Sequence, residues 1–303
     1  MKKVETILLV GSEGFLGKNL VRLLIEHNYN IIGLDIQPTN NVKYTHFVQK
    51  NIFDLSINDI SFLNKLNSYG VIYTGGVSRN GIAATYPIES SQNTVSALVK
   101  LLELLNQTTP PTWMMLTSTR EVDILLDNKE SLFGKQKIYS TLKLTSELII
   151  ESYSEYWNIP LKILRLSDIF GIGDHKSKVI QIFLNKAIQN DIIEVNNTNI
   201  KLFLTEVTEI SSTIFKYVKK IEDDIEINNF EIIQLWDDNY YITLLELAYI
   251  SLELNPYSQS KILTKDGMTI NYSVKNKIKP NHMKVLENMN KLNIINLKKS
   301  KLK

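Results

Sequence analysis

The stretch ILLVGSEGFLG at residues 7–17 determines the fold class of this chain. Its first four residues are apolar and predict a buried strand, and the glycines that follow predict a tight turn leading into a helix at about 15–26. Gly11 would make the turn, Gly14 would let a ligand approach the backbone, and Gly17 would let the helix pack against the strand. Free N–H groups and the helix dipole at such a turn attract an anion, which favours the pyrophosphate of a dinucleotide; the alternative is a turn without a ligand.

A carboxylate follows the second apolar run of the chain. Residues 31–34 (IIGL) predict a parallel strand that ends in Asp35. An Asp at this distance from a glycine turn accepts the ribose hydroxyls of NAD and would repel the 2′-phosphate of NADP. Neither Ile36 nor Gln37 is an Arg that could bind that phosphate, so the sequence favours NAD. The alternative is an Asp that only ends a strand or caps a turn.

A tyrosine and a lysine four residues apart, Tyr139 and Lys143, lie in a segment with helical periodicity and therefore share one helix face. An ammonium group near a phenol favours the phenolate, so Lys143 would lower the pKa of Tyr139 toward the range of a general acid/base. Thr119 follows the apolar run at 113–116, at the end of a strand where such sheets bind ligands, and could hydrogen-bond a reacting oxygen. The alternatives are an amphipathic helix surface and ordinary turn residues.

Alternation of apolar strands with helical segments predicts an α/β fold, a Rossmann-type doubly wound parallel sheet with a smaller C-terminal substrate-binding lobe. Residues 1–168 would form the NAD-binding Rossmann domain, with a returning strand near 231–235, and residues 169–303 a mixed α/β substrate-binding lobe. The strands are expected near 6–10, 30–35, 71–75, 112–117 and 161–166, the helices near 15–27, 92–106 and 138–157, and in the lobe a helix near 176–189 and short strands at 192–195 and 200–204.

Further motifs extend this pattern along the chain. They are VIYTGGVS at 71–78, Tyr86-Pro87 followed by Asn93, LTSTREVD at 116–123, YSTLK at 139–143 followed by Glu147, LKILRLSDIFGIGD at 161–174, FLTEVTEI at 203–210 and the stretch at 232–253. With the glycine turn and Asp35, they resemble the extended short-chain dehydrogenase/reductases of the NAD-dependent epimerase/dehydratase family over nearly the whole chain. The resemblance implies a nucleotide-sugar enzyme with NAD as its cofactor.

The resemblance also implies roles for individual residues. Thr119, Tyr139 and Lys143 would be the catalytic trio. Around the cofactor it places Gly11, Gly14, Phe15, Leu16, Gly17, Asp35, Asn51, Ile52, Thr74, Gly75, Gly76, Asn93 and Thr117, together with Tyr139 and Lys143. Around the substrate it places Ser78, Arg79, Arg120, Asp168, Lys201 and Lys279.

Several residues depart from the family pattern where a nucleotide diphosphate would bind. Asp168 stands where many members have Asn, and a carboxylate near a diphosphate is unfavourable unless it is paired or turned away. Lys201 and Lys279 stand roughly where Arg is usual, and Lys holds a phosphate only as a point charge. Asn51 replaces the usual adenine-binding Asp.

Glu121 is the residue that could determine the reaction type. A carboxylate two positions after the catalytic Thr resembles the arrangement in sugar-nucleotide 4,6-dehydratases and uronic acid decarboxylases, where it could act as a base. Arg120 stands where dehydratases of the glucose type commonly carry an Asp as the acid, which weakens the elimination hypothesis. Arg120 could instead bind a substrate carboxylate or phosphate, or pair with Glu121.

Composition agrees with an enzyme of this size: 303 residues, 44% hydrophobic, with no cysteine and therefore no disulfide or thiolate site. A net charge of +2 gives no nucleic-acid signature, and no apolar stretch reaches membrane-spanning length. The four histidines lack metal-ligand spacing, so no metal site is expected, and His175 is more often an exposed loop residue than part of a cleft. The first strand follows MKK closely, which predicts no signal peptide and a cytoplasmic location.

Two surface features complete the predictions. The five lysines between 291 and 303 favour a solvated, partly disordered terminus over a contact with RNA, an acidic partner or a membrane. The helices at 92–106 and 138–157 resemble the pair through which family members form a homodimer, the alternative being that they only cover the sheet.

Three functional hypotheses remain open. The first is an enzyme that keeps NAD bound and oxidises and re-reduces a nucleotide sugar at a carbinol carbon, with Tyr139 as the acid/base. The second is an NAD(P)-dependent reductase or dehydrogenase of a keto-sugar or other small carbonyl compound, which would not need Glu121 as a base. The third is a catalytically silent dinucleotide-binding protein.

Overall fold

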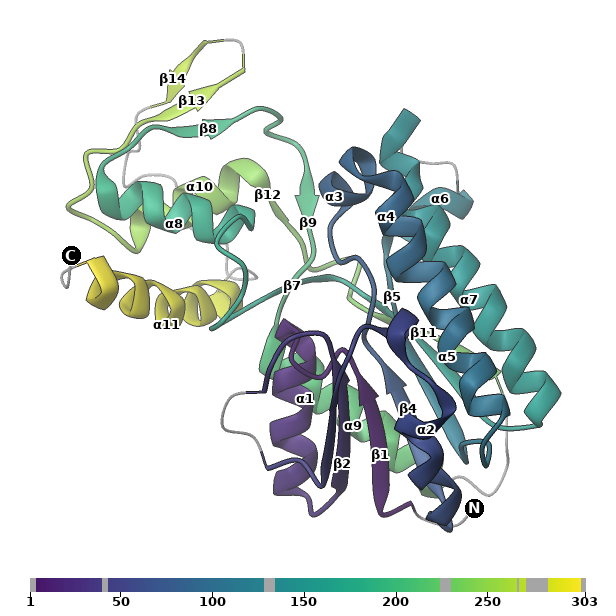
Figure 1. Cartoon of the computed structure of the whole chain (residues 1–303). Helices are drawn as coiled ribbons and strands as arrows, with labels where there is room; N and C mark the ends of the chain where they lie inside the picture. Colours follow the sequence, from purple (N-terminus) through teal and green to yellow (C-terminus); the bar gives the residue numbers. More distant parts are fainter. Residues whose placement is uncertain are drawn as a thin grey trace. The chain divides into compact units, whose positions relative to one another are not determined.

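The computed structural model describes residues 4–39, 43–127, 134–223, 230–265, 267–270 and 283–300 (Figure 1). The chain divides into two compact units. Unit 1 contains Met1–Leu166 and Ser211–Leu235, and unit 2 contains Ser167–Ile210 and Trp236–Lys303.

Unit 1 is built on a seven-stranded sheet in which every neighbouring pair is parallel. In spatial order its strands are β11 (Phe230–Leu235), β6 (Leu161–Leu166), β5 (Trp113–Thr119), β4 (Tyr69–Tyr73), β1 (Thr6–Val10), β2 (Asn30–Asp35) and β3 (His46–Gln49). The strand order reverses between β1 and β4, which is the switch point where doubly wound sheets bind ligands. The predicted fold class is confirmed.

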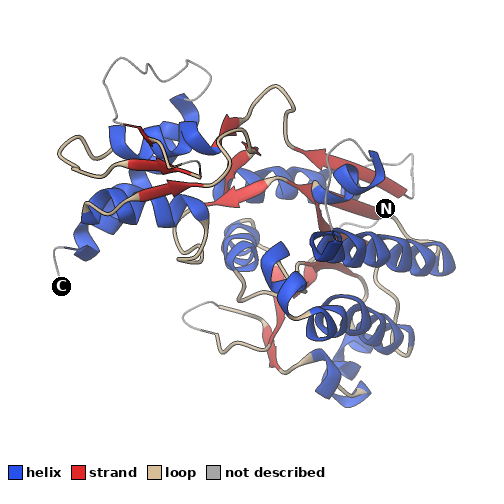
Figure 2. Ribbon diagram, turned by 90° about the horizontal axis from the view of Figure 1, so that it is seen from above, coloured by secondary structure: helices blue, strands red, loops and turns tan. Residues whose placement is uncertain are grey.

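Helices cover both faces of this sheet (Figures 1 and 2). The α-helices of unit 1 are α1 (Phe15–Glu26), α2 (Ile57–Ile60), α3 (Asn80–Thr85), α4 (Pro87–Ser91), α5 (Ala97–Asn106), α6 (Glu121–Asp127) and α7 (Lys137–Trp157), and α9 (Val207–Asp223) brings the chain back from unit 2. Helices α5 and α7 pack side by side, and their apolar residues Leu101 and Ile150 join the strand residues Val71 and Leu116 in one buried cluster. Helix α9 lies beside the end of α1, where the rings of His27 and Phe215 stack at 4.1 Å.

Short helical segments connect these elements. They are the 3-10 helices η1 (Ile52–Asp54), η2 (Ser61–Lys65) and η4 (Gly134–Gln136) and the π-helix η3 (Gln92–Ser96). The helix predicted at 92–106 therefore begins as η3, which continues α4 into α5. The strand predicted at 71–75 begins two residues earlier and ends at Tyr73, because the backbone turns at Gly76 with a φ of 100°.

Unit 2 is a mixed α/β unit. Its elements are β7 (Asp168–Phe170), α8 (Val179–Gln189), β8 (Ile193–Val195), β9 (Lys201–Leu202), β10 (Leu204–Glu206), β12 (Ile242–Thr243), α10 (Leu244–Glu253), β13 (Ile262–Thr264), β14 (Thr269–Ile270) and α11 (Met283–Ser300). Its core joins apolar residues of α8, α10 and α11, such as Phe183, Leu247 and Met289.

Two lobe predictions differ from the structure. The strand expected at 200–204 is two strands, because β9 pairs antiparallel with β12 whereas β10 pairs parallel with β7. The tail expected to be partly disordered from residue 291 continues α11 as far as Ser300. That helix is held by burial of Met289 and Leu292 on its apolar side, which the lysine count of the tail does not reveal.

Candidate active site

The glycine turn after β1 has the geometry that its sequence predicts. Gly11 adopts a φ of 78°, and a Cβ there would lie 2.8 Å from Thr74 Oγ1. A Cβ on Gly17 would lie 2.0 Å from the carbonyl oxygen of Gly11, so only glycine lets α1 pack this closely. The Thr74 hydroxyl donates to the carbonyl oxygen of Val10 at 2.8 Å and ties the end of β4 to the turn.

The start of α1 is open to an anionic ligand. Its N-cap is the exposed Gly14, and among the described residues no side chain caps the helix there. The first N–H groups of α1, on Phe15, Leu16 and Gly17, and the positive end of the helix dipole are what a pyrophosphate requires. The residues present therefore fit a dinucleotide.

Asp35 lies at the end of β2, beside the glycine turn. Its Oδ2 accepts the backbone N–H of Glu13 at 2.8 Å, and its Oδ1 accepts that of Gln37 at 2.9 Å. Two amide donors fix both carboxylate oxygens at the rim of the turn, where a ribose would lie. The ordered carboxylate would repel a 2′-phosphate at the same place.

Glu13 is a buried carboxylate inside the turn that sequence reasoning missed. The Tyr44 hydroxyl donates to Glu13 Oε1 at 2.6 Å, and Lys18 Nζ lies 3.3 Å from Oε2. Burial and the bond to Glu13 raise the pKa of the Tyr44 phenol above its ordinary value. An acidic residue between two turn glycines was the available signal, but its partner Tyr44 is 31 residues away.

The remaining predicted cofactor residues lie on the loops that follow the strands of unit 1. Asn51 caps η1, with its Oδ1 accepting the N–H of Phe53 at 3.1 Å, and Ile52 begins that helix. Thr117 lies on β5 and its hydroxyl donates to the carbonyl oxygen of Tyr73 at 3.3 Å. Gly75 and Gly76 follow β4, and Asn93 is exposed in η3.

Tyr139 and Lys143 lie one turn apart on α7, and both side chains are buried. Lys143 Nζ donates to the carbonyl oxygen of Thr117 on β5 at 3.4 Å, which brings α7 to the strand that carries Thr119. Burial lowers the pKa of Lys143 to about 8, against the opposing effect of the Glu147 carboxylate. The ammonium group is therefore charged at neutral pH and close to its titration range.

Thr119 and Glu121 lie at the carboxyl end of β5. The Thr119 Oγ1 accepts the N–H of Glu121 at 3.3 Å, and the Asn80 side-chain amide donates to Glu121 Oε2 at 2.9 Å. Asn80, on α3, was missed from the sequence and lies 41 residues from its partner. Arg79 and Arg120 are half-buried nearby in the sequence, and Ser78 is exposed.

A buried ion network lies behind Lys143 and was also missed. Glu147 on α7 and Asp123 on α6 both bind Arg165 of β6. Glu147 stands one turn after Lys143, and Arg165 is charged within the apolar run of β6. These two sequence signals could have indicated the pair.

In unit 2, Asp168 begins β7. Its Oδ2 accepts the N–H of Phe203 at 3.2 Å, so an amide donor partners its carboxylate. Lys201 Nζ lies 4.5 Å from the centre of the Tyr241 ring, a cation–π contact. His175 is exposed, with its Nδ1 2.7 Å from the Ser177 hydroxyl oxygen. Lys279 lies outside the described residues.

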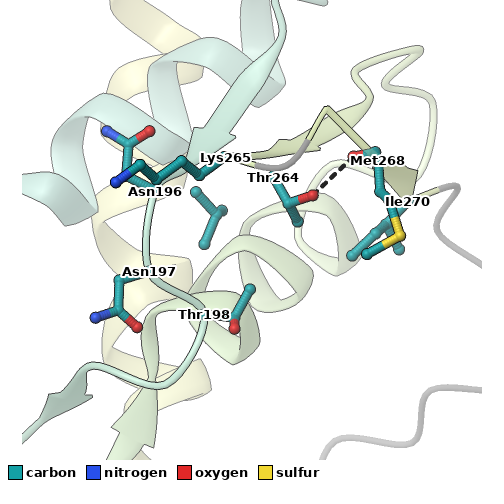
Figure 3. Close-up of a pocket in the computed structure, with 8 residues that line it drawn as sticks. Asn196, Asn197, Thr198, Thr264, Lys265, Met268 and Ile270 are labelled. Carbon is teal, nitrogen blue, oxygen red and sulfur yellow. Dashed lines mark hydrogen bonds between the residues drawn. The ribbon is translucent and has the colours of Figure 1, made fainter.

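Unit 2 also contains an open cavity of about 680 Å³ between the end of β8 and the β13–β14 hairpin (Figure 3). Its lining includes Asn196, Asn197 and Thr198 after β8 and Thr264, Lys265 and Met268 of the hairpin, and the Lys265 side chain lies beside Asn196. Among the described residues, none of those predicted from the sequence to bind cofactor or substrate or to act in catalysis lines this cavity.

Two features are absent from the described part of the chain. Within it, no group of three or more His, Cys, Asp or Glu side chains is placed to hold a metal ion. None of its helices is both long enough and apolar enough to cross a membrane.

Comparison with known proteins relates this geometry to a family. A profile described as the NAD dependent epimerase/dehydratase family matches residues 7–210. A dTDP-D-glucose 4,6-dehydratase of Dictyostelium discoideum is 23% identical over 265 residues, covering 76% of this chain and 61% of that protein. A dTDP-D-glucose 4,6-dehydratase of Bos taurus is 22% identical over 231 residues, covering 70% and 65%. The chain thus spans 61–65% of the length of these curated relatives.

Solved structures share the fold. A UDP-N-acetylglucosamine 4-epimerase from Methanobrevibacter ruminantium M1, in complex with UDP-N-acetylmuramic acid, superimposes with a TM-score of 0.74 at 18% identity, covering 97% of this chain and 98% of that one. For a UDP-glucose 4-epimerase from Thermotoga maritima with UDP-glucose, the TM-score is 0.72 at 14% identity, with 98% and 100% covered. The family profile spans more than half of the chain and confirms the resemblance found in the sequence, with NAD as the family's cofactor: the chain belongs to the NAD dependent epimerase/dehydratase family.

Proposed function

We propose that this protein is an NAD-dependent enzyme that modifies a nucleotide sugar through transient oxidation at a carbinol carbon. The observation that carries the proposal is the buried pair Tyr139 and Lys143, which the Lys143–Thr117 contact holds against β5. The names of the relatives support the substrate class, since they include nucleotide-sugar 4-epimerases and 4,6-dehydratases.

We assign unit 1 as the NAD-binding domain and unit 2 as the substrate-binding lobe. When bound, NAD would supply a hydride acceptor for the carbinol carbon. The phenolic oxygen of Tyr139 would take the hydroxyl proton, and the charged Lys143 would favour the phenolate. The oxygen of Thr119 accepts a backbone N–H, so its own proton can be donated to the reacting oxygen. Tyr139 would give the proton back to the same oxygen when the carbon is reduced again.

Replacing Tyr139 by Phe tests this assignment. The phenol is the proposed proton acceptor, so turnover should fall by about 10²-fold or more while NAD binding, measured by calorimetry, persists. Preserved turnover in Tyr139→Phe would remove Tyr139 as the acid/base. Mass spectrometry of nucleotide released from denatured protein separates the alternatives, because an internal redox cycle keeps NAD bound and a reductase must release it.

A second candidate function is elimination or decarboxylation with Glu121 as the base. The observation that favours it is the Asn80 amide bond to Glu121 Oε2 at 2.9 Å, which orients the carboxylate two residues from Thr119. Glu121→Gln keeps the shape and the capacity to accept this bond, but removes the base. Loss of product formation with NAD binding intact would support the lyase chemistry, and unchanged turnover would exclude the base role.

We further propose a homodimer formed through α5 and α7, and a cytoplasmic location. Leu148 and Tyr156 of α7 are 57% and 73% exposed, which supports a covering partner. NAD and nucleotide sugars are charged and do not cross membranes unaided, which supports the compartment. Light scattering should show a dimer for the native protein and a monomer for Leu148→Glu, and a monomeric native protein would refute the dimer. Cell fractionation tests the location.

A further inference from the structure

Four charged side chains of alternating sign follow one another inside unit 1, from Lys143 through Glu147 and Arg165 to Asp123. Lys143, Glu147 and Arg165 are 6%, 2% and 6% exposed. The side chain of Asp123 is 24% exposed. Only Lys143 of these four has a role in the proposed chemistry, which leaves three charges in this interior without an assigned purpose.

The contacts fix the Glu147 carboxylate from two strands. Arg165 binds it as a fork, with Nε 3.0 Å from Oε1 and Nη2 2.5 Å from Oε2. The Ser118 hydroxyl donates to the same Oε1, and Ser118 stands opposite Arg165 in the β5–β6 register. Both strands therefore present polar groups to α7 at one level. A bidentate guanidinium holds a carboxylate in position as well as in its charged form.

Asp123 completes the chain of charges on the far side of Arg165. Its Oδ1 accepts from Arg165 Nη1 at 2.8 Å and from the Gln234 side-chain amide at 3.2 Å. The Arg165 guanidinium is thus held between two carboxylates. Arg165 stays oriented toward Glu147 because Asp123 binds its third nitrogen.

Stability alone is a weak reason for this network. A buried ion pair often contributes no more than apolar side chains of similar volume, and the rest of β6 is buried and largely apolar. Its position suggests a different reason. Glu147 lies one turn from Lys143 on the same face of α7, and its carboxylate raises the pKa of Lys143 against the effect of burial.

We infer that Glu147 and Arg165, with Asp123 behind them, are positioning residues that keep the Lys143 ammonium group charged and in place beside Tyr139. The inference rests on the proposed role of Lys143. Arg165 and Ser118 fix the position of the Glu147 carboxylate, and its negative charge lies on the helix face that carries Lys143. The titratable groups on α7 and on the elements packed against it include Tyr139, Glu147 and Glu151 on α7, Glu89 on α4, Lys100 and Glu103 on α5, Lys135 on η4, Arg165 on β6, Asp123 and Glu121 on α6, and Arg120 after β5.

The test is to measure the pKa of Lys143 in Glu147→Gln. NMR of the lysine ε-carbon signal against pH gives this value, and the Lys143 signal is identified by its absence in Lys143→Arg. The Glu147 carboxylate raises the pKa of Lys143, so the midpoint in Glu147→Gln should fall below its native value. Turnover at pH 8 relative to pH 6 should fall by about tenfold or more, because the ammonium loses its proton within the working range. An unchanged Lys143 midpoint would overturn the inference.

A second variant separates positioning from folding. Glu147→Gln alone leaves Arg165 short of one partner, whereas Glu147→Gln with Arg165→Met removes both charges and the unpaired cation. If the network is only structural, the double variant regains the native pH profile along with its melting temperature. The inference requires that the midpoint of the Lys143 titration stay low in the double variant while its melting temperature recovers. The double variant can also be measured if Glu147→Gln alone does not fold.

Glu231→Gln is the matched control. It breaks the ion pair between Lys162 Nζ and Glu231 Oε2, 2.5 Å apart, which joins β6 to β11. This variant should lower the melting temperature and leave the Lys143 titration unchanged. The midpoint of the Lys143 titration is measured by NMR without enzyme turnover, so it can contradict the inference while the proposed function stands. Loss of activity with an unchanged Lys143 midpoint would count against the proposed function alone.

Discussion

Replacing Lys143 by Met should raise the free energy of unfolding of the cofactor-free protein at pH 7 by about 3 kcal/mol. Burial lowers the pKa of Lys143 from its ordinary 10.5 to about 8 in the folded protein. Each unit of such a difference corresponds to about 1.4 kcal/mol, and the difference here spans about two and a half units. The buried ammonium therefore opposes folding, and a methionine of similar length removes that cost.

The sign of the pH dependence follows from the same two values. Between pH 8 and 10.5 the unfolded chain binds a proton that the folded chain does not, so the native protein gains stability as the pH rises through this window. Below pH 8 both states are protonated and the cost is complete. At pH 9.5 the difference between Lys143→Met and the native protein should be less than half of its value at pH 7.

Urea unfolding of both proteins at pH 7 and pH 9.5 measures these differences. Lys137→Met is the matched control, because Lys137 is exposed on the first turn of the same helix and should change the unfolding free energy by less than about 0.5 kcal/mol. Two results would refute the assignment of Lys143 as a buried charge that opposes folding. One is a Lys143→Met variant that is less stable than the native protein at pH 7, and the other is a difference in unfolding free energy that does not change with pH.

Three further perturbations test other parts of the structure. Gly17→Ala should weaken NAD binding by more than about tenfold and lower the unfolding free energy by about 1–3 kcal/mol, because its Cβ would meet a carbonyl oxygen at 2.0 Å; Gly81→Ala, with no neighbouring atom within 4 Å, should be tolerated, and equal effects would contradict the steric argument. Asp35→Asn removes the charge that repels a 2′-phosphate, so calorimetry should show the preference for NAD over NADP falling by about tenfold, and an unchanged ratio would assign the discrimination elsewhere. Thr243→Ala removes the cap that accepts the N–H of Glu246 at 3.1 Å and should cost about 1 kcal/mol without affecting NAD binding; no loss of stability would mean that the cap is dispensable.

Local patterns were enough to predict six of the seven strands of the sheet, whereas the short edge strand β3 was not predicted. The runs that form β1, β2 and β6 are largely apolar, and the turn after β1 is recognisable from the spacing of its own glycines. The pair Tyr139 and Lys143 was equally local, since residues four apart share a helix face wherever the helix packs. These features did not depend on which distant segment came to lie beside them.

The boundaries of the smaller elements depended on their partners. Whether residues 201–206 form one strand or two is decided by β12 and β7, which lie outside that segment. Helix α11 continues to Ser300 because an apolar core receives its buried side, although the count of lysines predicted a solvated tail. Short strands and terminal helices carry too few residues for periodicity to outweigh such contacts.

The residues along the chain were sufficient to predict six strands of the large sheet, the helices that correspond to α1, α5, α7 and α8, the glycine turn, Asp35 and the Tyr139–Lys143 face, because each rests on residues within one element or one turn. The partners of these residues became visible only in the folded chain. Tyr44 reaches Glu13 across 31 residues, Asn80 reaches Glu121 across 41, and Arg165 joins Asp123 across 42. The physical reason is that a buried charge selects its partner through three-dimensional packing, which spacing along the chain does not encode.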